Sequence, residues 1–168
     1  MNADMRRSEL LSILSNANSP ISATLLAKKY NVSRQVIVGD IALLRATGAK
    51  IIATPRGYLV QNSDRGILHQ IACIHDSEKM RAELYTIVGQ GCKVIDVIVE
   101  HPVYGQLVGM LQLSTRDDVD QFILRCADSQ PLSYLTGGVH LHTISCPSET
   151  AFERVKTELN QLGLLLTE

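Results

Sequence analysis

Apolar positions in the first 60 residues recur with helical spacing and then change to the pattern of a short hairpin. The third helical stretch is the clearest, because Ile37, Ile41 and Leu44 share one face. Ser33 stands at its expected N-cap, and Gly48 stands where a helix would end. The pattern predicts helices at about 6–15, 23–30 and 34–47, and strands at 51–54 and 58–60.

The rest of the chain alternates between strand-like and helix-like stretches. Its predicted order is β-α-β-β-α-β, followed by one more helix and a short closing strand. Such an order favours a sheet with helices packed on one face. The predicted strands are 71–75, 94–100, 104–113, 139–145 and 164–166, and the predicted helices are 77–88, 115–128 and 148–162.

A polar stretch that ends in glycine, residues 61–66, separates the two patterns and is expected to be a linker. It divides the chain into predicted domains at 1–60 and 67–168. The expected fold is therefore α+β. An N-terminal winged helix-turn-helix is followed by a β-α-β-β-α-β sheet domain with helices on one face.

The net charge of −1 does not by itself suggest a nucleic-acid binder, but the charge is unevenly distributed. Residues 1–60 hold eight Lys or Arg and three acidic residues, a balance of +5. The remainder holds eight basic and fourteen acidic residues, a balance of −6. A basic head on an acidic body is typical of a DNA-binding module joined to a sensor.

Targeting signals and cysteine spacing narrow the class of protein further. No secretory signal is visible, and the apolar runs are far too short to span a bilayer, so we expect a cytoplasmic protein without membrane contact. The cysteines are widely spaced and form no C-x-x-C pair, which favours reduced core thiols over disulfides or a zinc cluster. They are Cys73, Cys92, Cys126 and Cys146.

Two helices joined by a tight turn and followed by a hairpin are the parts of a winged helix-turn-helix. The second helix begins with Ser33, Arg34 and Gln35. Arg can bond guanine bidentately, Gln can bond adenine, and Ser can reach a phosphate. Val38 shares the outward face and can meet a thymine methyl group, while Arg56 at the hairpin tip is expected to contact phosphate or the minor groove. A solvated helix start is the alternative for Arg34 and Gln35, and the hairpin at the right distance favours DNA binding.

Residues 32–45, Gly48 and residues 56–58 together resemble the winged-helix domain of the biotin-repressor type. The resemblance covers about the first 60 residues. It implies the fold and says nothing about a ligand.

A pair of histidines with i, i+2 spacing is the first indication of chemistry in the second half. On a strand, His140 and His142 point to the same face, where two neutral imidazoles can converge on one metal ion. The alternative is two histidines on a solvated face.

Glu83 borders the apolar stripe of its helix, so it needs a metal or a basic partner unless it reaches solvent.

Two other histidines flank predicted strands. His75 ends the strand before the helix that carries Glu83, and the two can meet only if residues 76–77 reverse the chain early, because eight residues of helix span about 12 Å. His101 lies at the turn between two predicted strands, where a polar turn residue is the plain interpretation.

Residues 66–168 resemble the 3H domain, in the pairing of His75 with Glu83 and in the stretches 101–105 and 137–142. A winged helix followed by a 3H domain is the arrangement of the niacin-responsive repressors. That family resemblance implies a sensor of nicotinic acid that carries a transition metal held by three His and one Glu. Residue by residue, it implies His75, Glu83, His140 and His142 as ligands. It also implies His101 as a contact of the pyridine ligand or of the metal ligands.

The predicted function is a transcriptional repressor, not an enzyme, with nicotinic acid as corepressor and nickel or zinc as the metal. A homodimer on double-stranded operator DNA is expected, since one winged helix contacts few base pairs. One alternative is a repressor for which the metal itself is the effector. The other is a small metal-dependent enzyme, but no Ser-His-Asp, Cys-His or H-E-x-x-H arrangement is apparent.

Overall fold

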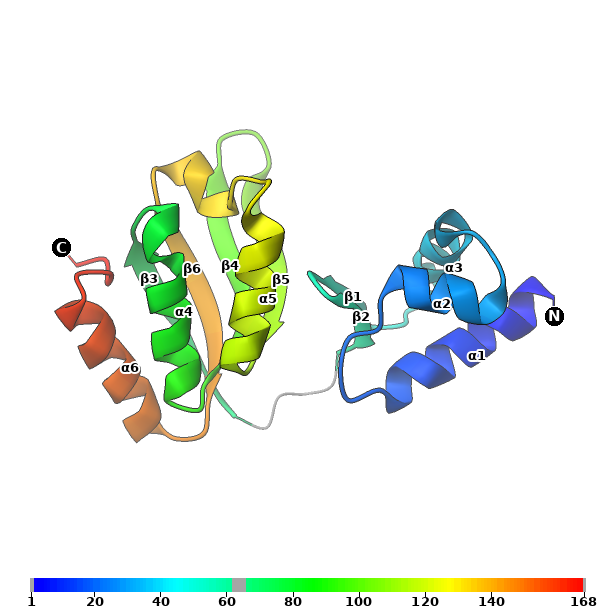
Figure 1. The fold of residues 1–168 in the computed structure, drawn as a ribbon, viewed down its shortest axis with the longest axis horizontal. Coiled ribbons are helices and arrows are strands. Elements are labelled where there is room, and N and C mark those ends of the chain that lie inside the picture. Colours follow the sequence, from blue (N-terminus) through cyan, green and yellow to red (C-terminus); the bar gives the residue numbers. More distant parts are fainter. Residues whose placement is uncertain (1, 62–65, 168) are drawn as a thin grey trace. The chain divides into compact units, whose positions relative to one another are not determined.

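The computed structural model describes residues 2–61 and 66–167, which form two compact units divided between residues 63 and 64 (Figure 1). Most of the predicted linker lies outside the described residues. No helix in the described part of the chain is long and apolar enough to cross a membrane.

The first unit contains three helices and one hairpin around a single apolar core. Asn2 extends the first helix beyond its predicted start, because its side chain accepts a hydrogen bond from the Met5 amide at 2.8 Å. Side chains of Ser22 and Ser33 cap the next two helices. The elements are α1 (Ala3–Asn16), α2 (Ala23–Tyr30), α3 (Arg34–Ala46), β1 (Ile51–Thr54) and β2 (Gly57–Val60).

The hairpin is fastened to the segment that precedes α2. Ile21 and Tyr58 exchange two backbone hydrogen bonds, each 2.9 Å long. Gly57 allows this approach, because its φ is 139° and a Cβ there would lie 2.3 Å from the Ile21 carbonyl oxygen. The first unit is therefore a winged helix-turn-helix whose wing is held at a fixed place beside α2.

A buried carboxylate joins α1 to α3. Asp40 is 3% exposed and accepts from Arg6 Nε at 2.6 Å and from Arg7 Nη1 at 3.4 Å. The Asp40 side chain raises the pKa of Arg6 by accepting this hydrogen bond. Arg6 and Arg7, two of the eight basic residues counted in residues 1–60, therefore form ion pairs within the domain.

The second unit is a four-stranded sheet covered by helices on one face. Its strand order is β3-β6-β4-β5, and every neighbouring pair is antiparallel. Figure 1 shows α4 and α5 in front of the sheet. The elements are β3 (Ile67–Ile74), the 3-10 helix η1 (Ser77–Lys79), α4 (Met80–Gly89), β4 (Lys93–His101), β5 (Gly105–Leu113), α5 (Arg116–Cys126), the 3-10 helix η2 (Leu132–Thr136), β6 (Val139–Cys146) and α6 (Glu149–Gln161).

Several predicted elements differ from the structure at their ends. The strand predicted over 71–75 is β3, which begins four residues earlier and ends at Ile74, so that His75 lies just beyond it. The helix predicted over 77–88 begins as the 3-10 turn η1, which changes the direction of the chain before α4. The closing strand predicted at 164–166 is reduced to one isolated bridge between Leu165 and Cys73, with flanking backbone hydrogen bonds to β3.

One apolar core fills the space between the sheet and its three long helices. All four cysteines are free thiols, as the sequence predicted, and Cys73, Cys92 and Cys146 are buried. Burial raises the pKa of Cys92 to about 12. The core residues with the least exposure include Leu84, Ile87, Val94, Leu113, Ile144, Val155 and Leu159.

Candidate functional site

Three histidines surround one buried carboxylate in the second unit. Glu83 Oε2 lies 2.6 Å from Nε2 of His75, and Oε1 lies 2.8 Å from Nε2 of His140 and 3.3 Å from Nε2 of His142. The four side chains are only 1–4% exposed. The residues come from three elements or their ends: β3, α4 and β6. We call this group the His/Glu cluster.

Two neighbouring strands, β6 and β3, position the three histidines of the cluster. His140 and His142 alternate with outward residues of β6 and therefore share the face that packs against α4. His75 follows the end of β3, the strand paired with β6. The 3-10 turn η1 then brings α4 back over the sheet, and this reversal places Glu83 against His75.

The second nitrogen of each histidine fixes its tautomer. Each Nδ1 is bonded to a backbone carbonyl, at 2.7 Å for His75, 2.8 Å for His140 and 2.6 Å for His142. Because a carbonyl can only accept, each Nδ1 carries a proton and each Nε2 faces the carboxylate. The acceptors are the carbonyls of Asp76, Gly138 and Asp96.

The donor set fits a cation. A neutral imidazole with a protonated Nδ1 presents a lone pair at Nε2, so three lone pairs and a carboxylate face one another in a dry space. His142 Nε2 is buried and has no hydrogen-bond partner among the described residues. Burial opposes a charge on His142, but the attraction of Glu83 raises its pKa. Burial likewise opposes ionisation of Glu83, yet His142 and its neighbours hold the pKa of this carboxyl well below its usual range.

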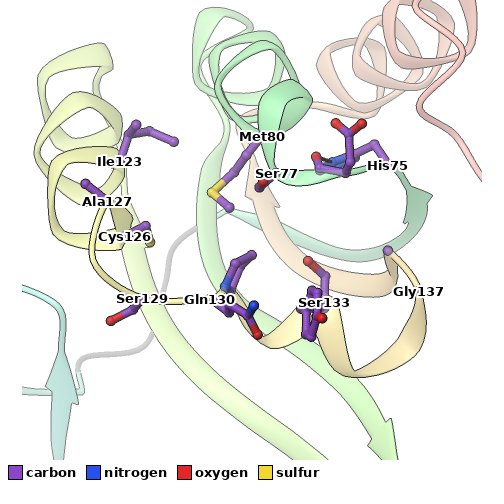
Figure 2. A pocket seen from close by; sticks show the side chains of 14 residues that line it. His75, Ser77, Met80, Ile123, Cys126, Ala127, Ser129, Gln130, Ser133 and Gly137 are labelled. Carbon is purple, nitrogen blue, oxygen red and sulfur yellow. Dashed lines mark hydrogen bonds between the residues drawn. The ribbon is translucent and has the colours of Figure 1, made fainter.

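A cavity of about 670 Å³ opens beside the cluster, and His75 is part of its wall. Figure 2 shows Ser77 and Met80 on the same side as His75, Ile123 and Cys126 from α5, and Gln130 and Ser133 across from them. Its lining mixes apolar side chains with hydroxyl and amide groups, and it includes one acidic residue, Asp76, but neither Lys nor Arg. The full lining is His75, Asp76, Ser77, Met80, Ile123, Cys126, Ala127, Ser129, Gln130, Pro131, Ser133, Tyr134, Gly137 and Gly138.

In the first unit, the start of α3 is available to a large partner. Ser33 accepts from the Val36 amide at 3.2 Å, and Arg34 and Gln35 are exposed. Val38 is half-buried. Arg56 lies in the turn between β1 and β2, half-buried, and its amide donates to Thr54 Oγ1.

Comparison with known proteins identifies both units. Residues 68–168 match the family model of the 3H domain, and residues 6–59 match that of an HTH domain. The chain belongs to the 3H domain family. It is 42% identical over 165 residues to a probable transcription repressor NiaR of Thermotoga maritima, covering 97% of this chain and 94% of that protein. It is 43% identical over 169 residues to the transcription repressor NadR of Bacillus subtilis, with the same coverage of both chains. The chain is a transcription repressor of this family, as the sequence predicted.

Within the 3H domain, the structure brings together four of the five residues singled out from the sequence. His101 lies apart, at the end of β4, where its Nδ1 accepts from the Val103 and Tyr104 amides at 3.1 and 3.2 Å. It does not line the cavity. Its role as a ligand contact therefore stays a prediction.

Two parts of the 3H domain site were missed from the sequence. The stretch 129–134 contributes Ser129, Gln130, Pro131, Ser133 and Tyr134 to the cavity wall, but it holds no charged residue, histidine or cysteine that could have singled it out. Cys73 was interpreted as a core thiol, yet its sulfur, a Glu83 oxygen and a His140 nitrogen all lie within 4.8 Å of one another. The C-x-H spacing of Cys73 and His75 repeats the H-x-H spacing on the paired strand, and this was the available signal.

Proposed function

We propose that this repressor binds operator DNA in response to nicotinic acid and that its 3H domain carries a divalent transition metal, nickel or zinc. The observation that carries the proposal is the convergence of three buried Nε2 atoms on the Glu83 carboxylate. Groups of this kind, held by hydrogen bonds at the opposite ring nitrogen, are the usual surroundings of a bound metal.

His75, Glu83, His140 and His142 would hold the metal. Imidazole nitrogens and a carboxylate suit both zinc and nickel, and calcium and magnesium prefer all-oxygen sites. When bound, the metal supplies a fixed positive charge and a Lewis acid at the edge of the cavity. The chain's own part is to orient the donors through the backbone carbonyls of Asp76, Gly138 and Asp96.

The cavity is the proposed site of nicotinic acid. Its apolar side chains suit a pyridine ring, and its volume is ample for a single-ring ligand. A carboxylate entering this cavity meets no Lys or Arg among the lining residues. The charge needed to bind the acid would therefore come from the metal behind His75, and nicotinamide, which lacks the carboxylate, should bind less tightly.

Binding of the corepressor and of DNA must be coupled in both directions. A ligand raises operator affinity only if it binds the DNA-competent state more tightly. Operator DNA must then tighten nicotinic acid binding by the same factor, typically about 5- to 150-fold. The test is calorimetric titration of the metal-loaded protein with nicotinic acid, with and without operator DNA, paired with operator-binding anisotropy at several acid concentrations. An operator affinity that nicotinic acid leaves unchanged, or weakens, would overturn the proposal.

A repressor that senses the metal itself is the second candidate. The observation in its favour is that the cluster is almost completely buried and draws its residues from α4, β6 and the end of β3. Binding of the metal alone could therefore stabilise the packing of these three elements. This candidate predicts operator binding that depends on zinc or nickel and is unchanged by nicotinic acid. The same anisotropy titration separates the two.

A homodimer is proposed as the DNA-binding species, with contact through the 3H domain. Cross-strand pairing sets Ala72, Leu141, Ile98 and Val108 in one row on the sheet face opposite the helices. Val108 is 53% exposed at the end of this row, and Leu68 on the same face is 57% exposed. A second copy that covers this face would bury apolar surface and place two recognition helices on one operator.

A further inference from the structure

Cys73 lies in the wall of the His/Glu cluster rather than elsewhere in the core. Its sulfur is within 4.8 Å of both a Glu83 carboxylate oxygen and a His140 ring nitrogen, and the residue is 0% exposed. The three groups belong to different elements: β3, α4 and β6. This proximity therefore depends on the fold and is not a result of neighbouring positions in the chain.

Strand register explains the proximity. Cys73 of β3 is paired directly with His140 of β6, and both side chains point toward α4. Directly opposed residues have Cβ atoms about 4.5–5.5 Å apart, within reach of a shared metal ion. His75 is two residues beyond Cys73, as His142 is two residues beyond His140, so each strand offers two donors at i, i+2 spacing.

A second observation points to a ligand at this place. His142 Nε2 is buried, lacks a hydrogen-bond partner among the described residues and lies 3.3 Å from the same Glu83 carboxylate. The carboxylate that lies close to the Cys73 sulfur therefore also faces a buried nitrogen without a hydrogen-bond partner among the described residues. A thiol, three imidazoles and a carboxylate in one dry space are the donor types that zinc and nickel bind most readily.

We propose that Cys73 binds the metal as a thiolate, as a fifth protein group beside His75, Glu83, His140 and His142. The inference rests on the proposed metal site. Coordination replaces the thiol proton, which leaves to solvent. The thiolate and the Glu83 carboxylate together balance the two positive charges of a divalent ion. The occupied site is then neutral, so no net charge is buried in the core. The metal can then attract the carboxylate of nicotinic acid through an open coordination position.

The test uses full-length protein titrated with Co²⁺ and observed by absorption spectroscopy. A thiolate bound to Co²⁺ gives an intense sulfur-to-metal charge-transfer band in the near ultraviolet, in addition to the weaker visible bands that any Co²⁺ site shows. Wild type and a Cys126→Ser control are expected to show both sets of bands. Cys73→Ser is expected to keep visible bands, to lose the charge-transfer band and to bind Zn²⁺ at least about 10-fold more weakly in chelator competition.

Wild-type protein alone provides a second measurement that no folding defect of the variant can affect. X-ray absorption of the zinc-loaded protein is expected to show one sulfur scatterer at about 2.3 Å. Stoichiometric metal without a sulfur scatterer or charge-transfer band would overturn the role of Cys73 and leave the His/Glu metal site standing. Wild-type protein that binds neither Co²⁺ nor Zn²⁺ would overturn the proposed metal site and, with it, this inference.

Discussion

Glu83 Oε2 lies 2.6 Å from His75 Nε2, although the two residues are eight positions apart across the start of a helix. Both side chains are almost fully buried. The contact depends on the 3-10 turn η1, which Asp76 caps by accepting from the Glu78 amide. Without this reversal, an unbroken helix would separate the two by about 12 Å.

Replacing Glu83 should abolish stoichiometric metal binding. Glu83→Gln keeps the size of the side chain but removes the charge and one acceptor oxygen, so metal affinity should fall by at least about 100-fold. Elemental analysis of purified protein and chelator competition measure this. Glu78→Gln, an exposed position in η1, is the matched control and should bind metal like wild type. A Glu83→Gln protein with a full complement of tightly bound metal would refute the ligand set.

The pH dependence of stability should differ between metal-free and metal-loaded protein. Burial opposes charge on His75 and His142, but Glu83 raises the pKa of both. A group with a raised folded pKa stabilises the fold below its unfolded pKa of about 6.5 and loses that contribution as pH rises through the folded pKa. Metal needs unprotonated imidazoles, so its contribution grows over the same interval.

Thermal denaturation in chelator and in zinc, at steps from about pH 6 to pH 9, measures the difference. The gap in Tm between the two forms should widen as pH rises. Glu83 should contribute equally at every step of this range, because a carboxyl with a lowered folded pKa loses its contribution only as pH falls below its unfolded pKa of about 4.3. Two curves that run parallel over the whole range would contradict the prediction.

The sequence predicted the structure well where a residue's chemical role agreed with the local pattern of apolar and polar positions. His140 and His142 were placed on one strand face from their spacing alone, and α2 was predicted with its observed bounds because Ser22 caps it. Strand order was not predicted, because the β3–β6 pairing joins segments about 70 residues apart. For the same reason the position of Cys73 opposite His140 needed the structure. Arg6 was counted as surface charge, since nothing local shows that Asp40 is buried beside it.

Asp40→Asn should destabilise the helix-turn-helix unit. The substitution leaves the Arg6 and Arg7 guanidinium groups without a carboxylate between α1 and α3, where Asp40 is 3% exposed. The expected loss is about 2–3 kcal/mol of unfolding free energy, measured by urea denaturation. Asp4→Asn removes an ion pair whose carboxylate is 86% exposed, and it should cost well under about 1 kcal/mol. Equal effects of the two substitutions would show that the buried pair is not structurally important.

Arg34 and Gln35 should determine operator choice. Arg34→Ala is expected to cost about 1–3 kcal/mol on the correct operator and to relax specificity at one base pair. Arg56→Ala should weaken all sequences more evenly and reduce the salt dependence of binding, because phosphate contacts carry no sequence information. Arg125→Ala, which removes an exposed charge in the 3H domain, is the control. Unchanged operator affinity in an Arg34→Ala, Gln35→Ala double variant would exclude α3 as the recognition helix.

A charge on the open face of the sheet should separate the proposed dimer. Val108→Glu places a carboxylate at the end of the apolar row formed with Ile98 and Leu141, where a second copy would have to bury it unpaired. Sedimentation at micromolar concentration should then show a monomer, and operator affinity should fall because two half-sites are no longer bound together. Leu124→Glu changes an apolar residue of α5 that is even more exposed, at 68% against 53%, and should leave the dimer intact. Dimers that persist in Val108→Glu but not in Leu124→Glu would move the interface from the sheet to the helical face.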